Sequence, residues 1–545
     1  MTDKLDLILR NGKFWTGVRN HPFAGTVGVA GEMIALVSDK ADEPLIADVE
    51  IDLQGQFAMP GFIDAHTHFR KGGESLRQLD LHSARNEKDF YELVRAFASS
   101  QPPDRWIIGN KWDNENWERS ALPSKERIDR FTPGTPVFLD RIDTHTALVN
   151  SCALRLAGID KGTSDPTGGV VVRDESGEPT GIVKDAAREI VLKVIPEISF
   201  EDRLLDAKSA VRHASSLGVT SAHDMSSKAD VRLYERLLQS RELSVRLYSI
   251  PPLGRSQGLR DDGMKQDSNC RGDSWIESGA TKAFADGSLG SGTASFFEPY
   301  YDDPSNYGIG TELLSSGKLE KLALEADRNH IQLAIHAIGD KAVSNVLDLF
   351  ERISRENPDW DRRVRIEHAQ HLREDDFSRF SRFHVVASVQ PYHCIDDGRW
   401  AMSKIGAQRA ERAFAFRKML DENIVLAFGT DWPVAPLNPL YGIYAAVTRA
   451  TIDGKNPDGW IPQQKITLEE SLRAYTFGGA YASFSESEKG TIETGKLADI
   501  IVLSENPFEV MVDRLKDIET VLTIVGGKTV FGKGRFSEYL GQPAS

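Results

Sequence analysis

Residues 62–68 read FIDAHTH, with polar groups at every second position: Asp64, His66 and His68. Side chains two positions apart on a β-strand lie on the same face of the strand. Two imidazoles that converge from one strand face are typical ligands of Zn²⁺ and similar ions. Hydrogen-bonded core histidines also produce a His-x-His pattern, so this motif alone does not decide the chemistry.

Four further apolar runs end in a charged group or a potential metal ligand. These groups are Lys282 in ATKAFADG, His336 in IQLAIHA, His368 in RIEHA and Asp431 in LAFGTD. Barrel enzymes place their catalytic residues at the carboxyl ends of parallel strands. Residue types that suit Zn²⁺ at five strand ends together predict a metal centre, and an aspartate there can take a proton from water held by the metal.

The central part of the chain alternates short apolar runs with helix-like segments, a pattern typical of parallel βα units. Eight candidate strands begin near residues 62, 218, 245, 280, 331, 363, 384 and 424. Eight such units predict an α/β fold of the (β/α)₈ TIM barrel type over residues 59–480. Residues 70–200 are too long for a connection and have their own helix and strand patterns, so we predict a cap inserted after the first strand, over the active-site face.

Both ends of the chain contain short β-rich runs broken by glycine. Residues 1–58 include LDLILRNGKFWTG and GTVGVAGEMIALVSD, and residues 481–545 include KGTIETGKLADIIVLSENP and TVLTIVGGKTVFG. Neither end has enough strands to close a core alone. We therefore predict one small β-sandwich that is built from both termini.

The bulk composition narrows the class of protein. The chain has 545 residues of which 40% are hydrophobic, enough for a large core. Its net charge of −15 disfavours a general nucleic-acid binder, and no apolar stretch approaches the roughly 20 residues of a membrane span. The chain does not begin with a signal-peptide pattern. Its cysteines, Cys152, Cys270 and Cys394, are odd in number and far apart, so we expect a cytoplasmic protein without a disulfide framework.

The sequence resembles the amidohydrolase superfamily of metal-dependent hydrolases. The motifs that carry this resemblance are PGFIDAHTH, LAIHAIGD, RIEHAQ and FGTDWPV. A narrower set resembles the branch that contains N-substituted formamide deformylases: DRIDTHTALVNSCAL, TKAFADGSLGSGTASFFEPY and GTIETGKLADIIVLSENPF. The resemblance covers nearly the whole chain and is more specific for the superfamily than for the substrate.

The resemblance implies a metal site in which each strand end has a role. The implied ligands are His66, His68, Lys282, His336, His368 and Asp431. An unmodified lysine ammonium has no lone pair to donate, and many members carbamylate the lysine that corresponds to Lys282, so that it bridges two metals. The sequence does not decide whether the site binds one or two Zn²⁺ ions, and we prefer two.

The implied reaction is hydrolysis of a carbon–nitrogen bond in a small amide, N-substituted formamide or cyclic amide. Zn²⁺ lowers the pKa of water that it binds to about 7. Asp431 accepts the proton and returns it to the leaving nitrogen, and a metal or His145 stabilises the oxyanion. Four residues in expected active-face segments are the predicted substrate contacts: His145, Trp112, Tyr392 and Trp432. For each aromatic residue the alternative is that it packs loops together.

Two other functions share the same residues. A deaminase of an amidine-type ring would use the same hydroxide. Deaminases of this superfamily usually keep a glutamate near the fifth strand, and LAIHAIGD has none in register, which argues against this function. A non-catalytic regulatory relative would be free to lose ligands, whereas this chain keeps the set. Relatives often have an arginine at the position of Gly292, so the substrate preference here can differ. Homodimers are common among relatives, and the sequence identifies no dimer surface.

Overall fold

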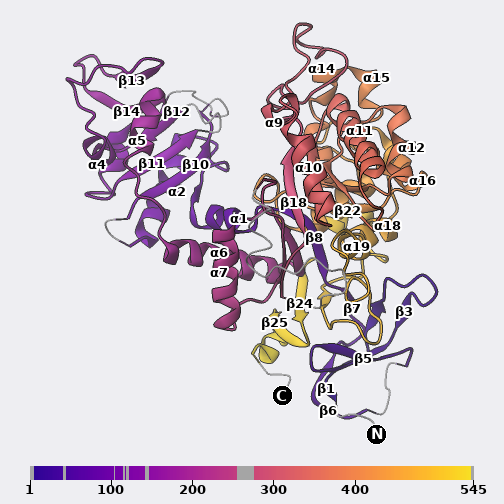
Figure 1. Cartoon of the computed structure of the whole chain (residues 1–545). Coiled ribbons are helices and arrows are strands. Elements are labelled where there is room, and N and C mark those ends of the chain that lie inside the picture. Colours follow the sequence, from indigo (N-terminus) through magenta and orange to yellow (C-terminus); the bar gives the residue numbers. More distant parts are fainter. Residues whose placement is uncertain are drawn as a thin grey trace. The chain divides into compact units, whose positions relative to one another are not determined.

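The computed structural model describes residues 5–40, 45–102, 105–114, 117, 122–141, 146–254 and 275–541. The chain forms two compact units (Figure 1). One consists of Met1–Arg70 and Ala210–Ser545, and the other of Lys71–Ser209. The segment predicted as an insertion, residues 70–200, thus falls almost entirely within the second unit. The larger unit contains the strand ends that carry the predicted ligands.

Two parallel sheets of the larger unit contain the eight strands predicted from the sequence, together with β17. In the first sheet the order is β17 (Ile276–Ser278), β16 (Arg246–Ser249), β15 (Val219–Asp224) and β8 (Phe62–Thr67). In the second it is β18 (Ala280–Phe284), β19 (Gln332–Ala337), β20 (Arg365–His368), β21 (Val386–Val389) and β22 (Leu426–Phe428). Because all these pairings are parallel, the carboxyl ends within each sheet lie at the same edge.

Backbone contacts also join the two sheets. Isolated parallel bridges pair Thr67 with Trp432, and Pro252 with Lys282. At the first of these bridges, the His68 amide donates a hydrogen bond to the Trp432 carbonyl at 2.8 Å. The carboxyl ends of β8 and β22 are therefore held side by side.

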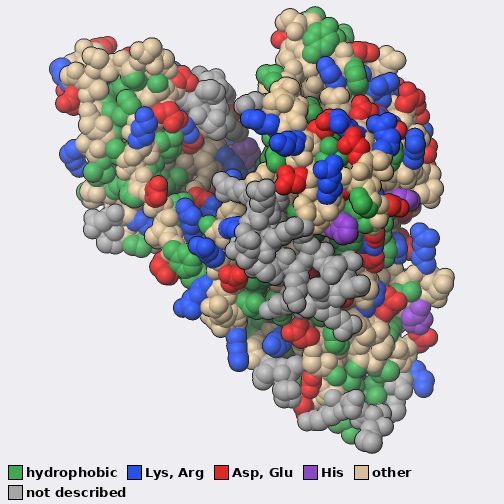
Figure 2. Space-filling model, in the orientation of Figure 1, with side chains coloured by type: hydrophobic (Ala, Val, Ile, Leu, Met, Phe, Trp, Pro, Cys, Tyr) green, Lys and Arg blue, Asp and Glu red, His purple; other side chains and the backbone are tan. Residues whose placement is uncertain are grey.

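Helices of the second sheet's βα units bury one apolar face and expose a charged one. α11 (Asp340–Glu356) buries, among others, Val343, Val346, Leu347 and Phe350, which recur at helical spacing. Ion pairs link each outer helix to the next: Arg352 of α11 to Glu320 of α10 (Lys318–Arg328), Arg379 of α12 (Glu374–Arg382) to Asp348 of α11, and Lys418 of α16 (Phe416–Asp421) to Glu374 of α12. Figure 2 shows acidic and basic side chains next to one another over these helices, so charge of one sign does not dominate this face.

The two ends of the chain contribute to one hydrophobic core. A four-stranded sheet has the order β5 (Met33–Ser38), β4 (Thr26–Ala30), β1 (Leu5–Arg10) and β6 (Ala47–Asp52). A six-stranded sheet has the order β25 (Lys528–Gly532), β24 (Thr520–Val525), β23 (Ile500–Leu503), β7 (Phe57–Pro60), β2 (Lys13–Trp15) and β3 (Phe23–Ala24). Buried residues from both sheets, including Leu7, Val27, Ile500 and Leu522, belong to one cluster.

The smaller unit is built on a six-stranded sheet. Its order is β13 (Gly169–Arg173), β14 (Pro179–Asp185), β12 (Thr146–Val149), β11 (Val137–Arg141), β10 (Ile107–Trp112) and β9 (Leu79–Asp80). Helix α2 (Glu87–Ser100), capped by the Asn86 side chain, packs Phe90 and Val94 into the core of this unit. Across the described part of the chain, no helix combines the length and apolar composition that a membrane crossing requires.

Trp112, which we predicted as a substrate contact, is a core residue of the smaller unit. Its side chain is fully buried, and its indole N–H donates a hydrogen bond to the Leu139 carbonyl at 2.8 Å. A tryptophan whose ring is enclosed and whose only donor is satisfied has the environment of a structural residue. We therefore do not retain Trp112 as a substrate contact, and His145 lies outside the described residues.

Candidate metal centre

Asp64, the first polar residue of FIDAHTH, connects β8 by hydrogen bonds to the segment that follows β22. Its carboxylate accepts hydrogen bonds from the Thr430 hydroxyl at 2.6 Å and from the amides of Thr430 and His66 at 3.0 and 3.1 Å. Burial raises the pKa of Asp64 to about 7, against the lowering effect of these hydrogen bonds. These bonds fix the Asp64 carboxylate between the backbone of His66 and Thr430, the residue before Asp431.

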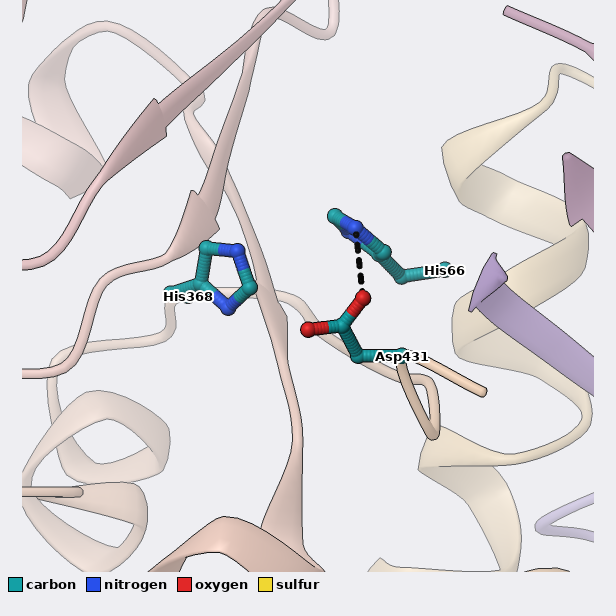
Figure 3. Close-up of side chains that lie close together, drawn as sticks. All are labelled: His66, His368 and Asp431. Atoms are coloured by element: carbon teal, nitrogen blue, oxygen red, sulfur yellow. Dashed lines mark ion pairs between the residues drawn. The ribbon is translucent and has the colours of Figure 1, made fainter. Parts of the chain in front are cut away.

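His66, His368 and Asp431 form a compact group of potential metal ligands (Figure 3). One ligand atom from each residue lies within 4.8 Å of the others, and all three residues are buried. The Nε2 atom of His66 lies 3.5 Å from Oδ1 of Asp431, and the rings of His66 and His368 have centroids 5.0 Å apart. Residues on or just after three strands that are distant in sequence therefore place potential ligand atoms close together.

The hydrogen bonds of the two imidazoles determine which nitrogen is available. Nδ1 of His66 lies 2.5 Å from Oε2 of Glu367, and Nδ1 of His368 lies 2.7 Å from Oε1 of Gln390. The Gln390 amide nitrogen donates to the Ser388 carbonyl, which orients its oxygen toward His368. Since both partners are acceptors, Nδ1 carries the proton in each ring and Nε2 keeps its lone pair. This tautomer is the one that a metal ligand requires, so the donor set fits a metal.

The electrostatics keep the histidines neutral and the aspartate ionised. Burial lowers the pKa of His66 to about 4 and that of His336 to about 3, so both imidazoles are unprotonated at neutral pH. Burial alone would raise the pKa of Asp431. The hydrogen bond with His68 and the nearby imidazoles outweigh that effect and hold the pKa of Asp431 below its usual range. Neutral imidazoles and an ionised carboxylate are the forms that bind a divalent cation.

His68 and His336 lie beside the compact group. Nε2 of His68 is 3.4 Å from Oδ1 of Asp431, and about a quarter of the His68 side chain is exposed. The ring centroid of His336 lies 4.5 Å from that of His368. Nε2 of His336 faces the Gly287 carbonyl at 3.0 Å, which leaves Nδ1 with the lone pair. Contacts between side chains thus connect all four predicted histidine ligands with Asp431, directly or through a neighbouring ring.

Lys282, on β18, is buried at the same edge of the second sheet. Its Nζ lies 5.1 Å from the centroid of the Phe284 ring, and burial lowers the pKa of Lys282 to about 8. After burial, the charge of Lys282 is the next cause that lowers the pKa values of His66 and His336. Lys282 therefore lies within electrostatic range of two of the histidines.

Two of the grouped residues have a left-handed backbone. The φ angle is 75° at His368 and 60° at Asp431, a region that non-glycine residues rarely adopt. The Asp431 amide donates a hydrogen bond to the His66 carbonyl at 2.7 Å, which helps to hold this conformation. Backbone strain of this kind clusters at active sites, where surrounding structure fixes the geometry.

The model of the amidohydrolase family matches residues 49–531. The match spans most of the chain and includes every strand end that carries a predicted ligand. The chain belongs to the amidohydrolase family. The N-substituted formamide deformylase of Arthrobacter pascens is 28% identical to it over 97% of this chain and 98% of the relative.

Two other relatives of this amidohydrolase have higher sequence identity to it. Protein LONG AFTER FAR-RED 3 of Arabidopsis thaliana is 37% identical over 96% of this chain and 91% of that protein. The structure of an uncharacterized metal-dependent hydrolase from Pyrococcus furiosus aligns with a TM-score of 0.74 at 29% identity, over 92% of this chain and all of that one. These similarities place this amidohydrolase among the metal-dependent hydrolases.

The sequence analysis missed the residues that orient the amidohydrolase ligands. Glu367 holds His66, and its other oxygen accepts from Nε of Arg365 at 2.8 Å. Arg365 also bonds the Ala65 carbonyl, the Ser388 hydroxyl and Nδ1 of His223. Arg365 and Glu367 are two charged residues on one face of a short buried strand, RIEH. Buried charges need partners, so the presence of Arg365 and Glu367 in this apolar strand could have indicated a buried ion pair beside the ligands.

We predict that Glu367→Gln weakens metal binding by about 10- to 100-fold, the usual effect of removing an outer carboxylate partner of a ligating histidine. The glutamine amide can still accept a hydrogen bond from His66. It lacks the negative charge that forms the ion pair with Arg365. The measurement is metal retention during titration with a chelator. Glu320→Gln, on exposed α10, is the control and should match the wild type. Equal retention by all three proteins would contradict the assigned role.

The remaining predicted site residues have different environments. Tyr392 is half-buried in α13 (Pro391–Asp397), with its ring 6.5 Å from that of Tyr441. Trp432 is 4% exposed and packs against Phe69 and His213, so little of its ring is available to a substrate. Phe284 was not predicted, yet it is 46% exposed and its ring lies 5.1 Å from that of His336.

Gly292 occupies a position where a side chain is costly. Its φ angle is 69°, a left-handed value that glycine adopts without strain. The Asn306 side chain donates a hydrogen bond to the Gly292 carbonyl at 3.0 Å. An arginine here would require a different local backbone or accept that strain.

Proposed function

We propose that this amidohydrolase hydrolyses the carbon–nitrogen bond of a small amide, N-substituted formamide or cyclic amide with a bound metal. The observation that carries the proposal is the convergence of two neutral imidazoles, each with a free Nε2, on an ionised Asp431 in a buried position. The activity named for the Arthrobacter relative supports an N-substituted formamide as the first substrate class to test.

We infer that the two parallel sheets form one (β/α)₈ barrel and that the two terminal sheets form a β-sandwich. Two isolated bridges support closure, because one links the ends of β8 and β22 and the other links the segment after β16 to β18. The cluster shared by the terminal sheets supports the sandwich. In such a barrel the ligands surround the mouth at the carboxyl ends of the strands.

We assign the metal to His66, His68, His336, His368 and Asp431, with Zn²⁺ as the first candidate because its preferred ligands are imidazole and carboxylate. Zn²⁺ would lower the pKa of water at the site and polarise the substrate carbonyl. Lys282 bears on the number of ions. Its lowered pKa of about 8 gives it more unprotonated amine at neutral pH than an exposed lysine has, and that amine is the form that adds to CO₂ to give a carbamate. Carbamylated Lys282 would supply an anionic oxygen between two ions.

Asp431 performs the proton transfer in this proposal. Its carboxylate is ionised, faces His66 and His68, and is almost fully buried. It takes a proton from the attacking water and gives it to the leaving nitrogen, so that the amine departs neutral. The three hydrogen bonds of Asp64 and the left-handed backbone at Asp431 hold the carboxylate in place for both transfers.

The test combines metal analysis with a panel of substrates. The purified protein should contain one or two equivalents of metal and should release amine from N-benzylformamide or from other N-acyl amines. Release of ammonia from an amidine-type ring, with no amide turnover, would favour the deaminase instead. The name of the Arabidopsis relative states no enzyme activity. Full metal content without turnover of any amide would accordingly favour a regulatory protein and contradict the proposal.

We predict that Phe284→Ala reduces kcat/KM for N-benzylformamide by about 10-fold or more, which corresponds to the loss of roughly 1–3 kcal/mol of apolar contact. The half-exposed Phe284 ring lies next to His336, where it can contact the apolar substituent on the amide nitrogen. Formamide, which has no such substituent, is the matched control substrate and should be hydrolysed at an unchanged rate. An equal loss on both substrates would contradict a role in specificity.

A further inference from the structure

We propose that His393 binds the scissile amide group of the substrate through its Nε2 atom. This inference rests on the proposed function. His393 lies in the first turn of α13, directly after the carboxyl end of β21, the strand that is followed by Gln390. Its ring is nearly parallel to that of the ligand His368, at 12° and with centroids 6.3 Å apart. His393 therefore lies beside the metal centre without belonging to the compact group of ligands.

The Nε2 atom of His393 is buried and has no hydrogen-bond partner among the residues that the structure describes. Leaving a buried polar atom unpaired costs about 1–3 kcal/mol. Such atoms in native proteins usually have a partner that is not part of the chain, such as water or a ligand. The position of this atom next to His368 makes a bound substrate the partner of interest.

Two carboxylates lie near His393. They belong to Asp431 in the centre and to Asp397, one helical turn further along α13. Asp397 is partly buried and accepts a hydrogen bond from the Gln370 amide at 2.8 Å. His393 therefore lies near both the proton-transfer carboxylate and a second carboxylate, which the Gln370 amide anchors.

An amide group matches what His393 offers. An imidazole nitrogen makes one hydrogen bond, either as a donor to the carbonyl oxygen or as an acceptor from the amide N–H. Either bond would fix the plane of the amide beside His368 and Asp431. Positioning of this kind raises the rate because the scissile carbon is already aligned with the attacking group. His393 would then act on the substrate directly.

The experiment compares three substitutions in the full-length, metal-loaded protein. Glutamine places a polar atom near the Nε2 position of histidine, asparagine places one near Nδ1, and phenylalanine keeps only the ring. We expect His393→Phe and His393→Asn to lower kcat/KM for N-benzylformamide by about 100-fold, and His393→Gln to stay within about 10-fold of the wild type. Metal content should be unchanged in all three. His21→Gln, at an exposed histidine paired with Asp39, is the control.

Several outcomes would overturn the proposal. They are full activity in His393→Phe, equal activity in the glutamine and asparagine variants, or loss of metal in proportion to activity, which would make His393 a packing support for His368. If the wild type binds metal but hydrolyses no amide, the proposed function fails separately. Calorimetry with N-benzylformamide then decides on His393. Binding at least 10-fold weaker in His393→Phe supports the contact, and equal binding, or none to the wild type, refutes it.

Discussion

Replacement of Asp431 by asparagine is expected to reduce kcat/KM by about 10⁴-fold while the metal stays bound. The estimate is the upper end of what a positioned general acid–base group contributes, because Asp431 serves in both proton transfers. Asparagine keeps the shape of the side chain and an oxygen that faces His66 and His68. It is also one of the few residues that tolerate the left-handed backbone at this position, so the local fold should survive.

The measurement for this variant is steady-state kinetics together with metal analysis on the same sample. Asp421→Asn is the matched control, because Asp421 is an exposed aspartate at the end of α16 that pairs with Arg417. The control should have wild-type activity. Retention of full activity by Asp431→Asn would refute its role in proton transfer. Loss of metal together with activity would instead make Asp431 chiefly a ligand.

The sequence was sufficient to predict the strands that carry the ligands. Each of the runs that end in His68, His336, His368 or Asp431 is apolar and short, and each has its polar group near its carboxyl end. A parallel arrangement then brings these ends to one edge whatever the details of register. The general place of the centre therefore follows from local patterns and from one topological rule.

The partners of the ligands could not be predicted in the same way. The bond from His66 to Glu367 joins residues 301 positions apart, and it depends on the register of strands in two different sheets. A local pattern contains no information about such a pairing. The contact between Gln390 and His368 could not be predicted either. It depends on how the ends of two neighbouring strands, β20 and β21, lie relative to each other.

Residue type also failed to separate structural from functional aromatic residues. Trp112 and Phe284 are both large and apolar, and each follows or ends a short strand. The structure encloses Trp112 completely and leaves Phe284 half exposed beside His336. Exposure depends on what packs around a side chain, and this is set by tertiary structure. The stretch QPYHCIDD likewise gives no sign that one ring nitrogen of His393 lacks a partner among the described residues.

Replacement of His66 by alanine is expected to lower metal affinity by more than 100-fold, a larger effect than the loss of an outer partner. His66 is buried, and its free Nε2 faces Asp431, so no other side chain of β8 can take its place. His68→Ala should also lose metal. We expect a smaller loss there, because His68 is partly exposed and water can occupy the vacated position.

Metal content after dialysis against a chelator measures both effects, and His21→Ala is the control at an exposed histidine. The alanine at position 66 leaves a buried space, so thermal unfolding should be followed as well. His66→Asn, which fills more of that space and cannot place a nitrogen at the Nε2 position, separates loss of a ligand from loss of the fold. If His66→Ala and His68→Ala both keep the wild-type stoichiometry, these histidines are not ligands. The case for a metal-dependent hydrolase would then lose its structural basis. Without His66, the compact group of potential ligands is reduced to His368 and Asp431.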